Sequence, residues 1–124
     1  SCPPAYVGSK ADIGNSVVAK GCEVLGEVKN SVLSYNTQVG EGAVVSYSVL
    51  MPGAVVESGA VVQYAIVGES CRIGRDAQVG APPETAQDPD DWGVAVLGPG
   101  TVIGDGEIVP AKTLLDRHHG EVKA

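Results

Sequence analysis

The sequence repeats a six-residue motif in which an aliphatic residue is often followed by Gly and then, three positions later, by Ala. Over this motif lies a longer period: residues 30–46, 47–63 and 64–80 are each 17 residues long and align without a gap. Hexapeptide periodicity is typical of a parallel β-helix, in which neighbouring coils bury a shared core. We therefore predict an all-β fold, a single-stranded left-handed parallel β-helix of about five to six coils.

The alignment also predicts which side chains point into the β-helix. Each of these positions is aliphatic, as the narrow interior of a β-helix requires. The small residues four positions later, Cys22 and Cys71 among them, are expected to fill the remaining space as Ala does in the other units. The predicted inward residues are Val7, Ile13, Val18, Val24, Val28, Leu33, Val39, Val45, Leu50, Val56, Val62, Val67, Ile73, Val79, Leu97, Ile103 and Val109.

Two features stand out from this regular pattern, a short coil and a column of polar and aromatic residues at one corner. Residues 15–29 form a coil of only 15 residues, so we expect one of its corners to be tightened. Asn15 and Asn30 fall at one corner of consecutive coils, and Tyr47 and Tyr64 take the same corner in the next two. This column is either a stacked ladder that closes the corner or a platform for a ligand.

The predicted β-helix spans residues 7–110, after a linker at 1–6 and before a tail at 111–124 that we expect to cap the open end. Residues 81–93 are an insertion whose Pro and acidic content predicts neither strand nor helix. Such insertions often carry the function of repeat proteins. Trp92, the single Trp, either holds this loop against the β-helix or inserts into a partner chain.

Composition excludes several classes of protein. The 124 residues fit one domain, and 17 Gly with no Phe describe a turn-rich body with small side chains. A net charge of -7 argues against nucleic acid, because binding phosphates needs a basic face. No segment reads as a membrane span or signal peptide, so we expect a cytoplasmic protein. Three widely spaced Cys predict no disulfide framework.

The sequence offers few residues for catalysis, and we predict no catalytic residue and no metal site. His118 and His119 are adjacent, which suits neither a zinc site nor an acyl-transfer base. Cations are the better candidates, because a local group of them in an acidic chain can bind a phosphorylated metabolite. The predicted anion-binding residues are Lys112, Arg117, Arg72 and Arg75.

Several phrases of the sequence resemble one family. They are PPAYV at 3–7, NSVL at 30–33, VGEGA at 39–43, YSVLMPGA at 47–54 and WGVAVLG at 92–98. Together they resemble the C-terminal domain of bacterial glucose-1-phosphate adenylyltransferase, also called ADP-glucose pyrophosphorylase. The YSVLMPGA phrase with the Pro-Pro start is the more specific part, since hexapeptide units are shared with acyltransferases.

This resemblance implies a regulatory and oligomerisation domain. In the family a separate catalytic domain, with ATP and magnesium, converts glucose 1-phosphate to ADP-glucose and pyrophosphate for glycogen synthesis. The resemblance therefore implies no catalysis and no cofactor in this chain, which begins at Ser1 within what resembles an interdomain linker. The implied partners are that catalytic domain, further copies in a tetramer and a phosphorylated effector. In some members cations near the C-terminal end help to bind the effector, so the resemblance implies this role for Lys112 and Arg117 by their rough position, with Arg72 and Arg75 behind them.

Two other classes of function remain open from the sequence. A hexapeptide acyltransferase needs a CoA cleft and a catalytic His between subunits, and the position of the two His residues counts against it. A regulatory or scaffold paralogue without catalysis would show the same repeats.

Overall fold

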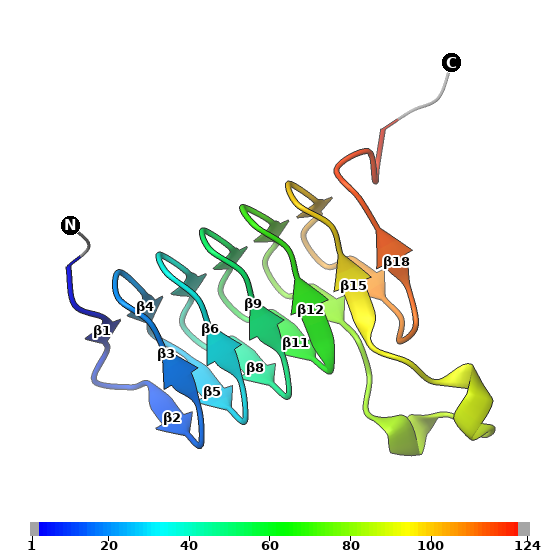
Figure 1. The fold of residues 1–124 in the computed structure, drawn as a ribbon, viewed down its shortest axis with the longest axis horizontal. Helices are drawn as coiled ribbons and strands as arrows, with labels where there is room; N and C mark the ends of the chain where they lie inside the picture. Colours follow the sequence, from blue (N-terminus) through cyan, green and yellow to red (C-terminus); the bar gives the residue numbers. More distant parts are fainter. Residues whose placement is uncertain (1–2, 122–124) are drawn as a thin grey trace.

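The computed structural model describes residues 3–121 and shows a three-sided β-helix (Figure 1). Three parallel sheets, each of six strands, form its sides, which confirms the predicted parallel β-helix and number of coils. Within residues 3–121 no helix has the length and apolarity needed to cross a membrane. We call the sheets A, B and C, and the columns of corners between them the A–B, B–C and C–A edges.

Every coil contributes one short strand to each sheet, and the bounds are as follows. Sheet A contains β1 (Tyr6–Val7), β4 (Glu23–Val24), β7 (Gln38–Val39), β10 (Val55–Val56), β13 (Arg72–Ile73) and β16 (Val102–Ile103). Sheet B contains β2 (Asp12–Gly14), β5 (Glu27–Lys29), β8 (Val44–Ser46), β11 (Val61–Gln63), β14 (Gln78–Val79) and β17 (Ile108–Val109). Sheet C contains β3 (Val17–Val18), β6 (Val32–Leu33), β9 (Val49–Leu50), β12 (Ala65–Val67), β15 (Ala95–Leu97) and β18 (Leu114–Leu115).

The register follows the 17-residue alignment. Leu33, Leu50 and Val67 are paired across sheet C, and Leu97 continues the row after the insertion. All four are 0–1% exposed. The prediction of which side chains point inward is therefore confirmed for these coils.

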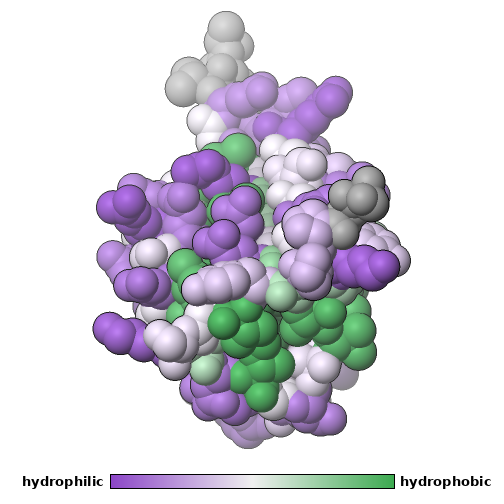
Figure 2. All heavy atoms as spheres, turned by 90° about the vertical axis from the view of Figure 1, so that its left-hand side faces the viewer, coloured by the Kyte–Doolittle hydropathy of each residue, from purple (hydrophilic) through white to green (hydrophobic). Residues whose placement is uncertain are grey.

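The first coil departs from this pattern. Val7 is 49% exposed, and Ile13 and Val18 are only half-buried, although all three occupy inward positions. The expectation of a buried Val7 was wrong because no coil of residues 3–121 covers this end. Figure 2 looks onto this end and shows hydrophobic atoms gathered in its lower half.

The small inward residues pack as expected. Cys22 and Cys71 are buried, 2% and 0% exposed, and neither is in a disulfide. The Cys22 thiol donates to the Ser34 carbonyl and lies 3.1 Å from the Thr37 hydroxyl. These cysteines fill core space, and every buried side-chain N and O atom of residues 3–121 has a hydrogen-bond partner.

The strands extend beyond the predicted limits of 7–110. Tyr6 is already in β1, and the Gly21 N–H donates to the Pro3 carbonyl, so the expected linker begins the β-helix. At the other end β18 pairs with β15, within the predicted tail. Leu115 of β18 packs against the core, which explains why the helix continues past Pro110.

The insertion lies between β14 and β15 and extends from the body of the β-helix (Figure 1). It contains two single-turn 3₁₀ helices, η1 (Pro83–Thr85) and η2 (Pro89–Asp91), where we expected no helix. In each a Pro occupies the first position, which suits its fixed φ. The Asp88 carboxylate caps η2 by accepting from the Asp90 N–H.

Candidate functional site: the aliphatic face of sheet C

The outer face of sheet C is aliphatic in every coil. One side chain of each strand points outward, directly before the inward residue. Four of the six are substantially exposed, from 41% for Ile66 to 76% for Leu114. The outward residues of sheet C are Val17, Val32, Val49, Ile66, Val96 and Leu114.

Sheets A and B do not share this property. The outward residues of sheet A include Glu23, Gln38 and Arg72, and those of sheet B include Asp12 and Glu27. Acidic side chains also gather along the A–B edge, which lies opposite sheet C in a three-sided body. Residues of this edge that carry carboxylates are Glu41, Glu57, Asp76, Asp105 and Glu107. These five carboxylates thus lie away from the aliphatic face.

A groove of about 600 Å³ runs along this face beside the B–C edge. Its floor includes Val17, Val32 and Val49, and its wall is the column of corner residues predicted from the sequence. Within the column the Asn15 amide donates to the Asn30 side chain over 2.6 Å. The Tyr47 and Tyr64 rings stack with centroids 4.7 Å apart and planes inclined by 6°.

The column is a ladder that closes the corner. Asn15, Asn30, Tyr47 and Tyr64 all have φ between 49° and 50°, the left-handed region that lets the chain turn sharply here. Because the tyrosine rings cover one another, they present their edges to solvent. This geometry supports the ladder and disfavours a platform on which a flat ligand would stack.

A second ladder of serines fixes the backbone behind the groove. The Ser31 N–H donates to the Ser16 hydroxyl, and the Ser48 N–H donates to the Ser31 hydroxyl. The Ala65 N–H donates to the Ser48 hydroxyl in the same way. Ser31 and Ser48 are buried, so these bonds form largely away from water and hold the edge of the groove rigid.

Trp92 holds the insertion against the end of the tyrosine ladder. Its indole N–H donates to the Ala81 carbonyl over 2.7 Å, and its ring meets Tyr64 edge-on with centroids 5.6 Å apart. Lys112 adds a second attachment, because its ammonium group donates to the Asp90 carbonyl over 2.8 Å. Of the two roles open for Trp92, the structure shows the one within the chain.

Replacing Trp92 by alanine is expected to release the insertion. The lost hydrogen bond and aromatic contact together should lower the free energy of unfolding by about 1–3 kcal/mol. Limited proteolysis should then cut residues 81–93 faster than in the parent chain. Trp92→Phe is the matched control, since it keeps the edge-on contact and should give a smaller effect; unchanged cleavage in Trp92→Ala would contradict the attachment.

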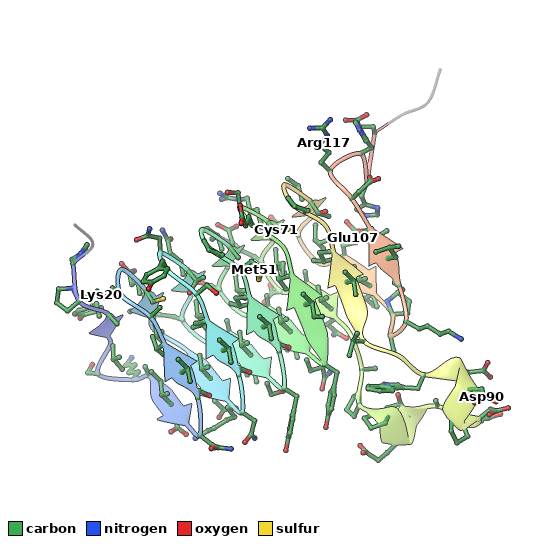
Figure 3. All side chains as sticks on the ribbon, viewed as in Figure 1. Lys20, Met51, Cys71, Asp90, Glu107 and Arg117 are labelled. Atoms are coloured by element: carbon green, nitrogen blue, oxygen red, sulfur yellow. The ribbon has the colours of Figure 1, made fainter. Side chains whose placement is uncertain are left out.

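The four predicted anion-binding cations lie on different parts of the β-helix. Arg72 is on sheet A, where it forms a 2.6 Å ion pair with Glu57, and Arg75 is on the A–B edge. Lys112 is at the B–C edge and reaches Asp90. Arg117 follows β18 at the C–A edge, and Figure 3 shows it on the opposite side of the molecule from Asp90. Within the described chain Lys112 and Arg117 thus lie on different edges, whereas Arg72 and Arg75 belong to one coil, with Glu57 beside both.

The C-terminal tail is attached through its histidines. The His119 ring contacts the Glu107 carboxylate, and the His118 ring lies 3.2 Å from Glu121. Burial would raise the pKa of Glu107, but the Gly104 N–H and the His119 ring outweigh it and hold that pKa below its usual value. Both histidines thus have carboxylate neighbours in the tail and the A–B edge.

The described residues offer little else for chemistry. Residues 3–121 contain no group of three or more His, Cys, Asp or Glu side chains that could hold a metal ion. Burial raises the pKa of the Cys71 thiol, which opposes formation of a nucleophilic thiolate. The aliphatic face is consequently the strongest candidate site, and it is a surface for binding.

The sequence reasoning overlooked this face because it followed only the inward positions. A signal was present, since five of the six outward residues of sheet C, all but Leu114, stand immediately before a predicted core residue. Reading that second column of the 17-residue alignment finds an aliphatic residue at every position of sheet C. The other two sheets mix polar residues with aliphatic ones such as Val61, Val102 and Ile108.

Comparison with known proteins relates the chain to a family of hexapeptide domains. Residues 4–103 match the family model described as "GlmU-like, C-terminal hexapeptide". Glucose-1-phosphate adenylyltransferase of Desulfitobacterium hafniense is 35% identical over 116 residues, covering 89% of this chain and 29% of the relative. The enzyme of the same name from Clostridioides difficile is 51% identical over 53 residues, covering 43% of this chain and 14% of the relative. The chain thus spans less than a third of the length of these relatives.

Solved structures show the same fold. The acetyltransferase domain of PglB from Neisseria gonorrhoeae has a TM-score of 0.73 and 20% sequence identity to this chain. The match covers 89% of this chain and 51% of that one. At this level of identity the likeness concerns the β-helix alone.

Proposed function

The chain belongs to the GlmU-like, C-terminal hexapeptide family, and we propose that it is the regulatory and oligomerisation domain of a glucose-1-phosphate adenylyltransferase. The likeness over 89% of the chain to an enzyme of that name supports this proposal. In the proposed parent protein a separate nucleotidyltransferase domain converts ATP and glucose 1-phosphate to ADP-glucose and pyrophosphate.

The observation that carries the proposal is the aliphatic face of sheet C. Six outward aliphatic residues in a row are costly to leave in water and mark a surface that another body covers. The carboxylates of the A–B edge lie on the opposite side, so packing against sheet C would bury none of that column. We propose that the nucleotidyltransferase domain packs against this face, including the groove beside Tyr47 and Tyr64.

This division of labour leaves ATP and magnesium to the nucleotidyltransferase domain. Residues 3–121 contain no cluster of three or more side chains that could bind a metal ion. The proposal is tested by measuring ADP-glucose formation from ATP and glucose 1-phosphate. We expect product from a full-length protein that contains this chain and none from residues 1–124 alone. Product from the isolated chain would overturn the proposal.

The proposed effector is a phosphorylated metabolite, and Arg117 and Lys112 are its first candidate ligands. Arg117 is exposed, and within residues 3–121 its side chain donates one hydrogen bond, over 3.4 Å, to the His118 ring. Lys112 is engaged by the insertion, so an effector that binds it would also act on residues 81–93. Because Lys112 and Arg117 lie on different edges, an effector site would need further residues from the nucleotidyltransferase domain or from another copy.

Arg117→Ala in the full-length enzyme is expected to weaken activation and leave unstimulated turnover unchanged. Loss of one charged hydrogen bond costs about 1.5–3 kcal/mol, which corresponds to a rise of about tenfold or more in the activator concentration needed. The measurement is activation by a panel of sugar phosphates, and Lys112→Ala should act in the same direction. Lys20→Ala is the matched control, because Lys20 is an exposed cation of the second coil that is not among the candidate effector ligands. Unchanged activation in Arg117→Ala would remove Arg117 from the site.

An acyltransferase is the alternative that the fold alone would allow. In this chain the His119 ring contacts Glu107 of the A–B edge, and the His118 ring contacts Glu121 of the tail. CoA-dependent acetyl transfer by residues 1–124 would favour that alternative over the proposed regulatory domain.

A further inference from the structure

The second coil of the β-helix is two residues short, and the shortage falls at one place. Residues 8–11 and 40–43 each make a four-residue corner on the A–B edge, whereas only Leu25 and Gly26 join β4 to β5. The hydrogen bonds show which two positions are missing. In a complete corner the N–H of the first residue donates to the next coil, and the carbonyl of the fourth residue accepts from the coil before. The Leu25 N–H makes the first of these bonds, to the Val39 carbonyl, and the Gly26 carbonyl makes the second, from the Asp12 N–H. The second and third corner positions are therefore the missing ones.

The missing residues normally carry a bond from coil to coil. In later coils the third corner residue donates to the carbonyl of the second corner residue in the coil before it. Gly59 donates to Glu41 over 3.1 Å, Asp76 to Ser58 over 3.2 Å and Gly106 to Arg75 over 2.8 Å. Gly42 is the third residue of its corner, but the second coil has no carbonyl to offer it.

The shortage therefore leaves backbone groups unpaired on both walls of a notch. Among residues 3–121, the Gly42 N–H has no hydrogen-bond acceptor and the Ser9 carbonyl has no donor. Hollows of about 430 Å³ and 150 Å³ occupy this place, and both are lined by Lys10, Leu25 and Glu41. Lys10 stands on one wall and Glu41 on the other, and neither forms an ion pair within the described chain.

The notch is held open by the packing of its floor. A Cβ atom added to Gly26 would lie 2.4 Å from the Ala43 carbonyl oxygen and 2.6 Å from that of Gly40. The short corner is thus pressed against the third coil and cannot carry a side chain that would fill the space. The Leu25 side chain lies beneath Gly8, where an added Cβ would be 2.9 Å from Leu25 Cδ2.

We propose that this notch binds two residues of backbone from a partner polypeptide, presented at the tip of a tight turn. The partner carbonyl would accept from the Gly42 N–H, and its N–H would donate toward the Ser9 carbonyl, which restores the missing rung. Lys10 and Glu41 select the side chains of the turn by charge, and Leu25 provides an apolar floor. As in β-strand addition, main-chain hydrogen bonds would supply the affinity, here at one rung of a corner.

The test uses residues 1–124 and a capped dipeptide, acetyl-Glu-Gly-N-methylamide, which copies the Glu41–Gly42 pair that the second coil lacks. Followed by ¹H–¹⁵N NMR, the probe should shift the Gly42 amide signal and slow its hydrogen exchange, with a dissociation constant on the order of millimolar. The shifts should be confined to residues around Ser9, Lys10 and Gly42. Shifts spread over sheet C, or no shift at Gly42, would overturn the proposal.

An insertion variant is the decisive comparison. Placing Glu-Gly between Leu25 and Gly26 restores a 17-residue coil, so the chain fills its own notch. Gly42 should then be protected from exchange without the probe, and the response to the probe should be lost. Lys10→Met serves as a second variant that leaves the coil length unchanged and should weaken the response. A response that survives in both variants would show that the probe binds elsewhere.

Discussion

Replacing Leu50 by alanine is expected to lower the free energy of unfolding by about 2–5 kcal/mol, the range observed when a buried leucine is truncated in a packed core. Leu50 is 0% exposed and lies in the middle of sheet C, between Leu33 and Val67. Its loss should leave a cavity that neighbouring coils cannot close, because the three sheets hold one another at fixed distances. Chemical denaturation of residues 1–124 measures the change.

Val49→Ala is the matched control for that experiment. Val49 is the neighbouring residue of the same strand β9, but it points out of the β-helix. In the isolated chain its truncation should cost less than about 1 kcal/mol. Equal losses at the two positions would mean that the inward register is wrong.

Replacing Ile66 by aspartate in the full-length enzyme is expected to separate the proposed nucleotidyltransferase domain from sheet C. Ile66 is 41% exposed here, and packing against a partner would bury an unpaired carboxylate at that position. Such a charge costs about 3–5 kcal/mol, enough to weaken docking by about two to nearly four orders of magnitude. Activation by the effector should be lost, and the interface should become accessible to protease.

Val102→Asp controls for the introduced charge. Val102 points outward from sheet A and is 54% exposed, so the chemistry of the change is the same on a different face. Domain packing and activation should be preserved in this variant. If Val102→Asp disrupted the enzyme as strongly as Ile66→Asp, sheet C would have no special role in docking.

Much of the fold could be predicted because one alignment determines it. Once Leu33, Leu50 and Val67 are superposed, the strand pairs, the inward rows and the resumption at Leu97 follow. The exposure of Val7 could not follow from the alignment, since it depends on what lies beyond the first coil. The 3₁₀ turn η2 of the insertion is capped locally by Asp88, which hexapeptide periodicity does not encode.

The candidate site was less predictable than the fold. Lys112 and Arg117 are close in sequence but lie on different edges of the β-helix. Lys112 reaches Asp90, whereas Arg117 is on the opposite side of the molecule from Asp90, and the sequence alone does not show this difference. The notch beside Leu25 and Gly26 could be predicted in part, because a coil of 15 residues implies that one of its corners is shortened. Only the hydrogen bonds of the other corners show which two positions are missing.

The insertion between β14 and β15 has a consequence for engineering. Paired residues in sheet C are 17 positions apart for Leu50 and Val67, whereas Ala65 and Ala95 are 30 positions apart across the insertion. Closing the longer segment costs only about 0.5 kcal/mol more in chain entropy. A β-helix of this kind can therefore carry foreign segments at its corners with little thermodynamic penalty. Residues 81–93 mark a position where a binding peptide of similar length could be displayed on a rigid, repetitive support.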